Sequence, residues 1–451
     1  MKRSPILSAP RLFAYGGALF SMHFGATSLV WPMTWGKRGA DALLASFTGV
    51  FLSALLLPFL GYLALARGQG NFHQLTLRLL PRTGPVFTYA AIIILGPLYV
   101  LPRVSASCWD AGAQCFGLGG AGPLPPLAFS FGFYALVYCF AANRSHLIQR
   151  ISQILFPVLI CFVIVIIALG LARPLSPLPP QRFSAAAASL GFTEGYATAE
   201  LLCALIYGAI ILRELKSEGI GASGIRREIV KVALIGMGIL TLSHLGHMYI
   251  GASSGQSIPL LYVSLYTEVA MRLLGRAGGL IFTFALVMAS LTASVGISAA
   301  VTQFMEDASG GRLSYSRVLP LTAVTAALIG SLGLSQILSY LTPLLEVLYP
   351  PAIVLTLYYA FMPDCLNPRR LAPGKWAMAA GLLSGLLNGA AAYLRLFALP
   401  AQAFWRLYRL LPLADLGLSW LPAAALALAA GFLARNLGER RAKRAGKSLS
   451  P

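Results

Sequence analysis

Long apolar segments recur through nearly the whole sequence, and they restrict the chain to folds that a lipid bilayer can accept. A helix that crosses the hydrocarbon core needs about 20 mostly apolar residues. The composition agrees, since 57% of the 451 residues are hydrophobic and only 11% are charged. We therefore predict an all-α polytopic membrane protein with about twelve spans, at approximately 11–35, 43–66, 84–103, 127–142, 147–172, 190–212, 229–251, 277–304, 317–334, 336–361, 375–394 and 416–435.

The net charge of +20 first suggests a nucleic-acid-binding protein, but the positions of the charges argue against it. With the N-terminus in the cytoplasm, most of the 34 Lys and Arg residues fall in cytoplasmic loops. This bias is the positive-inside rule, and it predicts that both termini are cytoplasmic. The basic tail at 436–451 is expected to contact anionic lipid rather than nucleic acid. The first apolar stretch is too long for a cleavable signal peptide.

The first apolar segment contains residues that disfavour a continuous helix. Its middle reads Gly25-Ala26-Thr27-Ser28, and Pro32 then removes a backbone donor. Free backbone groups at membrane depth are tolerated only where protein, a ligand or a water-filled cavity satisfies them. A broken span of this kind indicates a transporter's binding site, and a proline-kinked packing helix is the alternative.

Two further segments combine irregularity with a carboxylate. The sixth carries Glu194 near its start and Glu200 deeper, and a carboxylate at membrane depth is a functional hypothesis by default. For Glu194, a solvated loop charge is the simpler interpretation. The tenth contains Pro343, Glu346 and the run Tyr349-Pro350-Pro351.

Other polar residues have simpler interpretations. His244 and His247 share a helix face but lack a third ligand at metal-site spacing, so they are expected to be packing residues. Arg103 is placed at an outer helix end, where an arginine normally reaches the interface. Cys108 and Cys115 fall in the loop predicted after the third span, where a disulfide is possible.

The spans form two blocks of five, and each block opens on an irregular helix. Because five is odd, the second block must be inserted upside down relative to the first, as in inverted-repeat transporters. We expect a first repeat at 1–172, an inverted second repeat at 190–361, two accessory helices at 375–435 and the basic tail at 436–451.

Six motifs in order resemble those of the bacterial branched-chain amino acid:cation symporter family, in the amino acid–polyamine–cation superfamily with its LeuT-type fold. The family's first-span GAGN is replaced by Gly25-Ala26-Thr27-Ser28, and its GPLF-x-x-PRT is similar to Gly96-Pro97-Leu98-Tyr99 with Pro102-Arg103. The others are Glu194-Gly195-Tyr196 with Thr198 and Glu200, Leu291-Thr292-Ala293-Ser294-Val295-Gly296, Gly333-Leu334-Ser335-Gln336 with Leu348-Tyr349-Pro350, and Leu411-Pro412-Leu413-Ala414 with Gly417-Leu418 and Trp420.

The resemblance implies a secondary transporter and not an enzyme. It would import leucine, isoleucine and valine, with methionine as a further substrate, with sodium as the coupling ion and no other cofactor. It would work in the bacterial inner membrane without an obligate protein partner. The implied substrate-binding residues are Gly25, Ala26, Thr27, Ser28, Tyr99, Tyr196, Thr198 and Glu200, and the implied sodium ligands are Ser21, Phe24, Thr292 and Ser294.

The chain departs from the family pattern at places where the fold holds substrate or cation. Ser28 stands where the family has asparagine, and Glu200 stands where it has aspartate. Glu346 adds a carboxylate at depth, where desolvation disfavours its charge, so it is a candidate proton site. Proton coupling therefore stays open beside sodium.

Four other functions remain open at this stage. A divalent-metal transporter of the same fold would explain two buried glutamates and the histidine pair, but it should carry an aspartate in the first break. An intramembrane enzyme would need a nucleophile or metal motif, and neither HExxH nor GxSxG occurs. A transporter-fold sensor, or an exchanger of another small apolar solute, would have the same sequence features.

Overall fold

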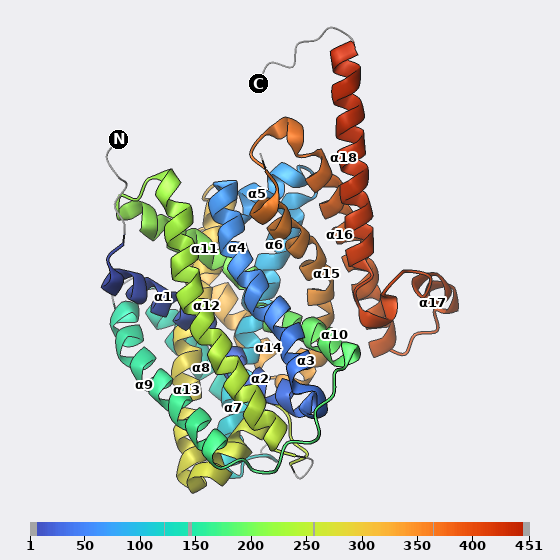
Figure 1. The fold of residues 1–451 in the computed structure, drawn as a ribbon. Helices are drawn as coiled ribbons and strands as arrows, with labels where there is room; N and C mark the ends of the chain where they lie inside the picture. The colour runs from blue at the N-terminus through green and yellow to red at the C-terminus, as the bar shows by residue number, and fades with distance from the viewer. Residues whose placement is uncertain (1–6, 121, 143–146, 256–257, 364, 445–451) are drawn as a thin grey trace.

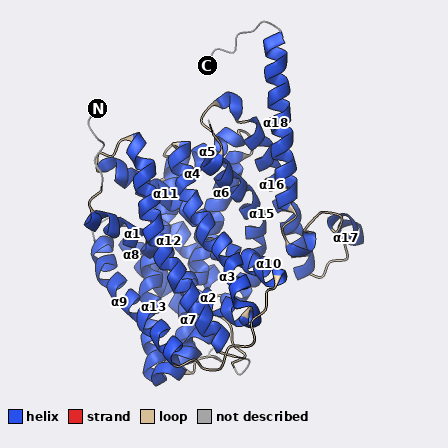
Figure 2. Ribbon diagram, in the orientation of Figure 1, coloured by secondary structure: helices blue, strands red, loops and turns tan. Residues whose placement is uncertain are grey.

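The computed structural model describes residues 7–120, 122–142, 147–255, 258–363 and 365–444, and within these ranges it contains helices and loops but no strand (Figure 2). The helices are α1 (Ala9–His23), α2 (Ala26–Arg38), η1 (Ala40–Ala42), α3 (Leu43–Val50), η2 (Phe51–Leu56), α4 (Leu57–Gly68), α5 (Phe72–Leu79), α6 (Gly84–Ile93), η3 (Ile94–Leu98), α7 (Val100–Phe116), α8 (Leu124–Ala142) and α9 (Leu147–Ala172). They continue as α10 (Ala185–Glu194), η4 (Gly195–Thr198), α11 (Glu200–Ser217), α12 (Ala222–Ser253), α13 (Tyr262–Ala308), α14 (Tyr315–Gly330), α15 (Leu334–Phe361), η5 (Pro368–Arg370), α16 (Ala372–Leu396), α17 (Gln402–Tyr408), η6 (Ala414–Leu416) and α18 (Trp420–Arg444).

The helices confirm the predicted all-α class and much of its segmentation. In the described part of the chain, eight helical segments are long and apolar enough to cross a membrane, and the bent pair α10–α11 makes a ninth. The helices α1, α2 and α14 are shorter, with 15, 13 and 16 residues. The number of twelve spans and the division into two inverted repeats therefore stay predictions.

Both predicted helix breaks are present. In the first, α1 ends at His23, and Phe24 and Gly25 lead into α2 in a non-helical conformation, with Gly25 at φ −95° and ψ −169°. In the second, the 3₁₀ turn η4 leads to Ala199, which has a left-handed φ of 62°, and the two helices differ in direction by 45°. Each break leaves backbone groups outside regular helix at the middle of its segment.

The third segment continues further than the sequence suggested. A single-turn π-helix, η3, carries Gly96 at φ −80° and ψ −107°, and the helix then continues as α7 to Phe116. Pro97 removes a backbone donor and bends the segment without ending it. The predicted end at Arg103 is therefore wrong. For the same reason, Cys108 and Cys115 are buried free thiols of α7 and not members of a loop disulfide.

Glycines bring the two broken helices into backbone contact with their neighbours. A Cβ added to Gly36 of α2 would lie 1.8 Å from the carbonyl oxygen of Met248 in α12, and one on Gly251 of α12 would lie 1.8 Å from that of Met33. On the other broken helix, a Cβ on Gly191 of α10 would lie 2.3 Å from the carbonyl oxygen of Ser46 in α3. Small residues at such crossings are typical of packed membrane helices.

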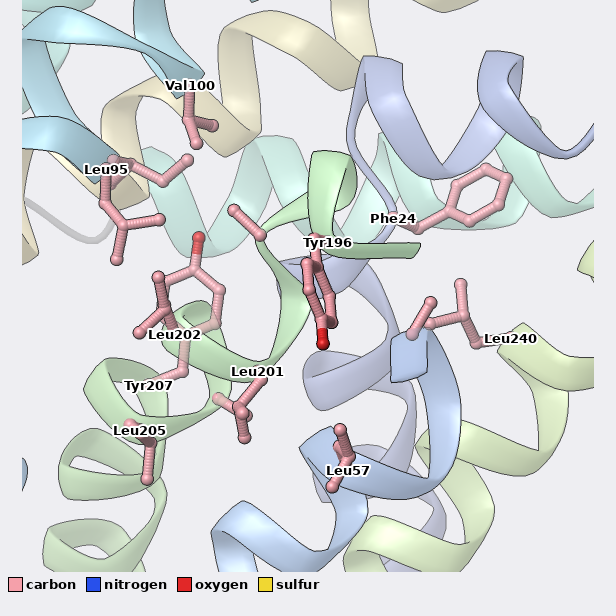
Figure 3. Packing of buried hydrophobic residues seen from close by; sticks show 14 of the residues in the cluster. Phe24, Leu57, Leu95, Val100, Tyr196, Leu201, Leu202, Leu205, Tyr207 and Leu240 are labelled. Atoms are coloured by element: carbon pink, nitrogen blue, oxygen red, sulfur yellow. The ribbon is translucent and has the colours of Figure 1, made fainter. Parts of the chain in front are cut away.

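The bundle places both breaks in its interior. The helix α12 runs diagonally beside α3 and α4, while α18 stands at one edge against α16 and extends beyond the other helices (Figure 1). A continuous apolar core surrounds the breaks, and Phe24, Leu201 and Leu240 belong to it (Figure 3). Polar groups in this region are thus enclosed by apolar side chains.

Candidate functional site

The two helix breaks meet at the carboxylate of Glu200. This residue begins α11, directly after the left-handed Ala199, and only 3% of it is exposed. The Ser28 hydroxyl, in the first turn of α2, lies within hydrogen-bond distance of Glu200 Oε1 and, at 2.7 Å, of the His23 carbonyl oxygen. The carboxylate therefore joins the start of one half-helix to the start of the other.

A buried histidine forms the second side of this cluster. The Nδ1 of His23, the last residue of α1, contacts Glu200 Oε2, and its Nε2 lies 2.7 Å from the Tyr62 hydroxyl on α4. One partner of the His23–Glu200 contact must carry a proton, because an unprotonated imidazole nitrogen and an ionised carboxylate are both acceptors. The ring of Tyr207 packs edge-on against His23 at 5.6 Å. A buried polar network of this kind is stable only when its members are satisfied.

Arg103 forms a separate buried charge beside the second break. Only 1% of it is exposed, and its Nη1 donates to the carbonyl oxygen of Ala197 in η4. Its guanidinium carbon lies 4.4 Å from the ring centre of Tyr99 and 4.9 Å from that of Trp31. Its Nε and Nη2 are buried without a hydrogen-bond partner. The expectation that Arg103 reaches the interface is wrong, because α7 continues past it.

A pocket of about 540 Å³ adjoins this arginine. Two of its lining residues, Trp31 and Ala197, contact Arg103, and a third, Thr342, has its hydroxyl 3.3 Å from that of Tyr99. The volume is in the range of small-molecule sites. The other lining residues are Asp110, Thr193, Glu194, Leu261, Tyr262, Val263, Ser264, Leu334, Ser335, Leu338, Ser339 and Glu346.

An ion pair lies at the edge of the pocket. The side chain of Arg38, at the end of α2, donates to Glu194 at the end of α10, and its guanidinium lies 5.6 Å from the ring centre of Tyr262. Arg38 is 34% exposed and Glu194 is 20% exposed, so the pair faces water. The interpretation of Glu194 as a solvated charge near a helix end agrees with this position.

The structure brings together part of the predicted substrate site. Gly25, Ala26 and Ser28 surround the first break beside Glu200, and Tyr99 hydrogen-bonds to the second break through the carbonyl of Ala197. For the three other predicted substrate-binding residues, the contacts in the structure do not indicate a role in binding substrate. Thr198 Oγ1 donates to the carbonyl of Gly195, Tyr196 stacks on Tyr349 and accepts from Trp420, and Thr27 is buried in the first turn of α2.

The four predicted sodium ligands do not point to one common place. Ser21 and Thr292 donate to carbonyls of their own helices, and Phe24 stacks on Phe20. Thr292 and Ser294 are two positions apart on α13, which corresponds to about 200° around a helix, so their hydroxyls point to different sides. Between them, Ala293 faces Gly25. A sodium site here stays a prediction.

The remaining predicted residues lie outside the His23–Glu200 cluster. Glu346 of α15 is partly buried and lines the pocket, and its role as a proton site stays a prediction. His247 has neighbours for both ring nitrogens, the Ser243 carbonyl at 2.7 Å and the Tyr266 hydroxyl at 2.8 Å, as expected of a packing residue. Among the residues that the structure describes, no group of three or more His, Cys, Asp and Glu could hold a metal ion.

Comparison with known proteins gives consistent matches over most of the chain. A family model described as branched-chain amino acid transport protein matches residues 8–437. The branched-chain amino acid permease BrnQ of Bacillus subtilis is 27% identical over 92% of this chain and 94% of its own length. The branched-chain amino acid transport system 2 carrier protein of Pseudomonas aeruginosa is 28% identical over 95% of this chain and 97% of its own length.

Solved structures share the fold at low sequence identity. The nucleobase-cation-symport-1 family transporter Mhp1, with bromovinylhydantoin bound, has a TM-score of 0.59 at 13% identity and covers 94% of this chain and 92% of its own. A manganese transporter variant from Eremococcus coleocola has a TM-score of 0.58 at 16% identity, over 97% and 98%. These likenesses concern the fold alone, which is that of solved membrane transporters.

Proposed function

The chain belongs to the branched-chain amino acid transport protein family, and we propose that it is a secondary transporter that imports branched-chain or similarly sized apolar amino acids. Its relatives are named as permeases and carriers, so it groups with transporters and not with enzymes. Leucine, isoleucine and valine are the proposed substrates, with methionine as a further one. The observation that best supports the proposal is the meeting of two helix breaks at a buried carboxylate, with Ala197 of the second break in the wall of a pocket.

In this proposal the substrate enters the pocket and reaches the two breaks in one state of an alternating-access cycle. Its ammonium is attracted by Glu200 and by carbonyls freed at the breaks. Its apolar side chain occupies the part of the pocket lined by Leu261, Leu334 and Leu338. Such a pocket separates homologous substrates weakly, by about 1–3 kcal/mol per methylene.

The proposed coupling ion is sodium, bound by oxygen atoms near Ser21, Phe24, Thr292 and Ser294. The support for it is the family resemblance of these segments, together with the approach of Ala293 to Gly25 at the first break. Hard cations prefer oxygen ligands. A second candidate is the proton, because Glu200 and Glu346 place two ionisable carboxylates inside the helix bundle.

The proposed location is the bacterial inner membrane, with both termini in the cytoplasm. The excess of Lys and Arg in alternate loops supports this orientation. The basic tail then faces the anionic leaflet. No protein partner is proposed.

Uptake into proteoliposomes tests the function directly. Purified protein is reconstituted, and entry of labelled leucine, valine and methionine is measured under a sodium gradient at fixed pH, then under a pH gradient without sodium. Leucine accumulation above the external concentration is expected. Transport of basic or acidic amino acids but not leucine would contradict the proposal, and binding without flux would indicate a sensor.

A further inference from the structure

Arg103 is a buried cation whose surroundings in this chain do not neutralise it. Among the described residues, no carboxylate lies within ion-pair distance of the guanidinium, and the Ala197 carbonyl satisfies only Nη1. Burying a charge without a partner is costly, so buried charges in proteins are paired or bind ligands. A functional role is the default interpretation for such a residue inside a membrane.

The free donors of Arg103 have the geometry of a carboxylate-binding edge. Nε and Nη2 lie side by side on one edge of the planar guanidinium, and they are the two nitrogens without a partner. That edge is the one that can donate two parallel hydrogen bonds to a carboxylate. The rings of Tyr99 and Trp31 lie within 5 Å of the guanidinium carbon and fix the group in place.

The first helix break offers a less suitable place for a substrate carboxylate. The start of α2 presents free N–H groups and the positive end of its dipole, which would attract an anion. However, the Glu200 carboxylate already lies there, in hydrogen-bond contact with Ser28. A second carboxylate beside it would be repelled by the first, whereas the ammonium of the same substrate would be attracted.

We propose that Arg103 anchors the carboxylate of the transported amino acid through Nε and Nη2. This assignment rests on the proposed function, and it names the group that recognises the substrate's α-carboxylate. Ala197, whose carbonyl accepts from Nη1, precedes Glu200 by three residues. The same broken segment therefore contributes to the surroundings of Arg103 and carries Glu200. Ala197 and Trp31, which contact the guanidinium, also form part of the pocket wall.

The proposal predicts selectivity for the carboxylate itself. Leucinamide has nearly the same shape as leucine, but its neutral amide cannot form two charge-assisted hydrogen bonds with Arg103. A hydrogen bond to a charged group contributes about 1.5–3 kcal/mol, so detergent-purified wild-type protein should bind leucine about 10- to 100-fold more tightly than leucinamide. Competition against labelled leucine gives this ratio of affinities.

The variant Arg103→Met removes the charge, and the ratio is expected to fall to about one. Arg272→Met is the matched control, because Arg272 pairs with Glu268 on a partly exposed face of α13, and its ratio should equal that of wild type. An unchanged ratio in folded Arg103→Met overturns the assignment. If that variant does not purify as a monodisperse protein, Arg103→Lys is the test variant. It keeps the positive charge but lacks the planar guanidinium with its two parallel N–H donors.

In Arg103→Lys the proposal requires a several-fold lower ratio, and a wild-type ratio overturns it. A wild-type protein that does not bind leucine at all contradicts the proposed substrate, and the inference falls with it. Leucine binding with a ratio that no Arg103 variant changes overturns only the role of Arg103. The two failures are therefore distinguishable.

Discussion

The imidazole of His23 and the carboxylate of Glu200 are in direct contact although 177 residues separate them in the chain. The contact joins the end of α1 to the start of α11, and so it crosses from the first broken segment to the second. Both residues are at least 97% buried, since the exposed fractions are 3% for His23 and 3% for Glu200. This pair is thus the polar link between the two breaks.

Removing one member of the pair should destabilise the protein more than removing both. His23→Phe leaves the Glu200 carboxylate buried with Ser28 as its remaining partner, and breaking a buried pair costs about 3–5 kcal/mol. In His23→Phe/Glu200→Gln the pair leaves no carboxylate buried without its histidine partner, so thermal stability should partly recover. Thermal unfolding of wild type, His23→Phe, Glu200→Gln and the double variant in one detergent measures this coupling, and additive losses would contradict it.

Gly25→Val should abolish leucine uptake while the protein still inserts into the membrane. A Cβ at Gly25 would lie 3.4 Å from Ala293 Cβ, which is ordinary contact, but the two γ-carbons of valine extend further towards α13. Gly25→Ala is the matched control and should keep most of the activity. Uptake normalised to the amount of reconstituted protein checks both, and normal uptake by Gly25→Val would remove this segment from the site.

Glu346→Gln tests which ion drives transport. With sodium as the proposed coupling ion, uptake driven by a sodium gradient at fixed pH should be the same in the variant and in wild type. Glu346 is only partly buried in the pocket, so the change to a neutral amide of the same size should be tolerated. Uptake that a pH gradient drives without sodium, and that the variant loses, would instead make Glu346 a proton carrier.

Arg38→Met should open the edge of the pocket with little effect on stability. The Arg38–Glu194 pair is partly exposed, and such pairs contribute about 0–1 kcal/mol. A thiol introduced by Thr342→Cys, in the pocket wall, should react faster with a membrane-impermeant maleimide when Arg38→Met is also present. Labelling at position 342 is followed by mass spectrometry. Equal rates with and without Arg38→Met would show that the pair does not limit access.

Gly36→Ala and Gly251→Ala should each lower the unfolding temperature. An added Cβ would lie 1.8 Å from the backbone of the facing helix in both cases, and forced overpacking typically costs about 1–3 kcal/mol. Gly296→Ala on α13 is the control, because nothing lies within 4 Å of a Cβ there. It should be neutral or slightly stabilising, since alanine favours a helix. Unchanged unfolding temperatures for both α2–α12 variants would contradict the close crossing.

The sequence predicted the breaks more accurately than the groups that meet at them. The run from Gly25 to Ser28 and the carboxylate at Glu200 are local signals, because flexible residues and a charge at membrane depth are each visible in a short window. His23 has no such signal. It is a single histidine in an apolar run, and its partners Tyr62 and Glu200 come from other helices.

Arg103 and the hydroxyls of α13 show the two other limits of sequence reasoning. The prolines around Arg103 resemble a helix end, but a π-turn absorbs the bend and the helix continues, so the arginine lies inside the bundle. Thr292 and Ser294 occur in one motif, yet the helical period turns their side chains to different sides. Residues that are close together in a sequence motif therefore need not have side chains that point to the same place.

The backbone contacts between α2 and α12, and between α10 and α3, limit how the pocket can change shape. Helices that slide past one another do so across a layer of side chains that adopt new rotamers, and at Gly36, Gly251 and Gly191 no such layer exists. Each pair is then expected to turn as a rigid body. The dihedral changes are expected at the few residues whose φ and ψ are not helical, Phe24–Gly25 and Ala199, so these positions would act as the hinges that open and close the pocket.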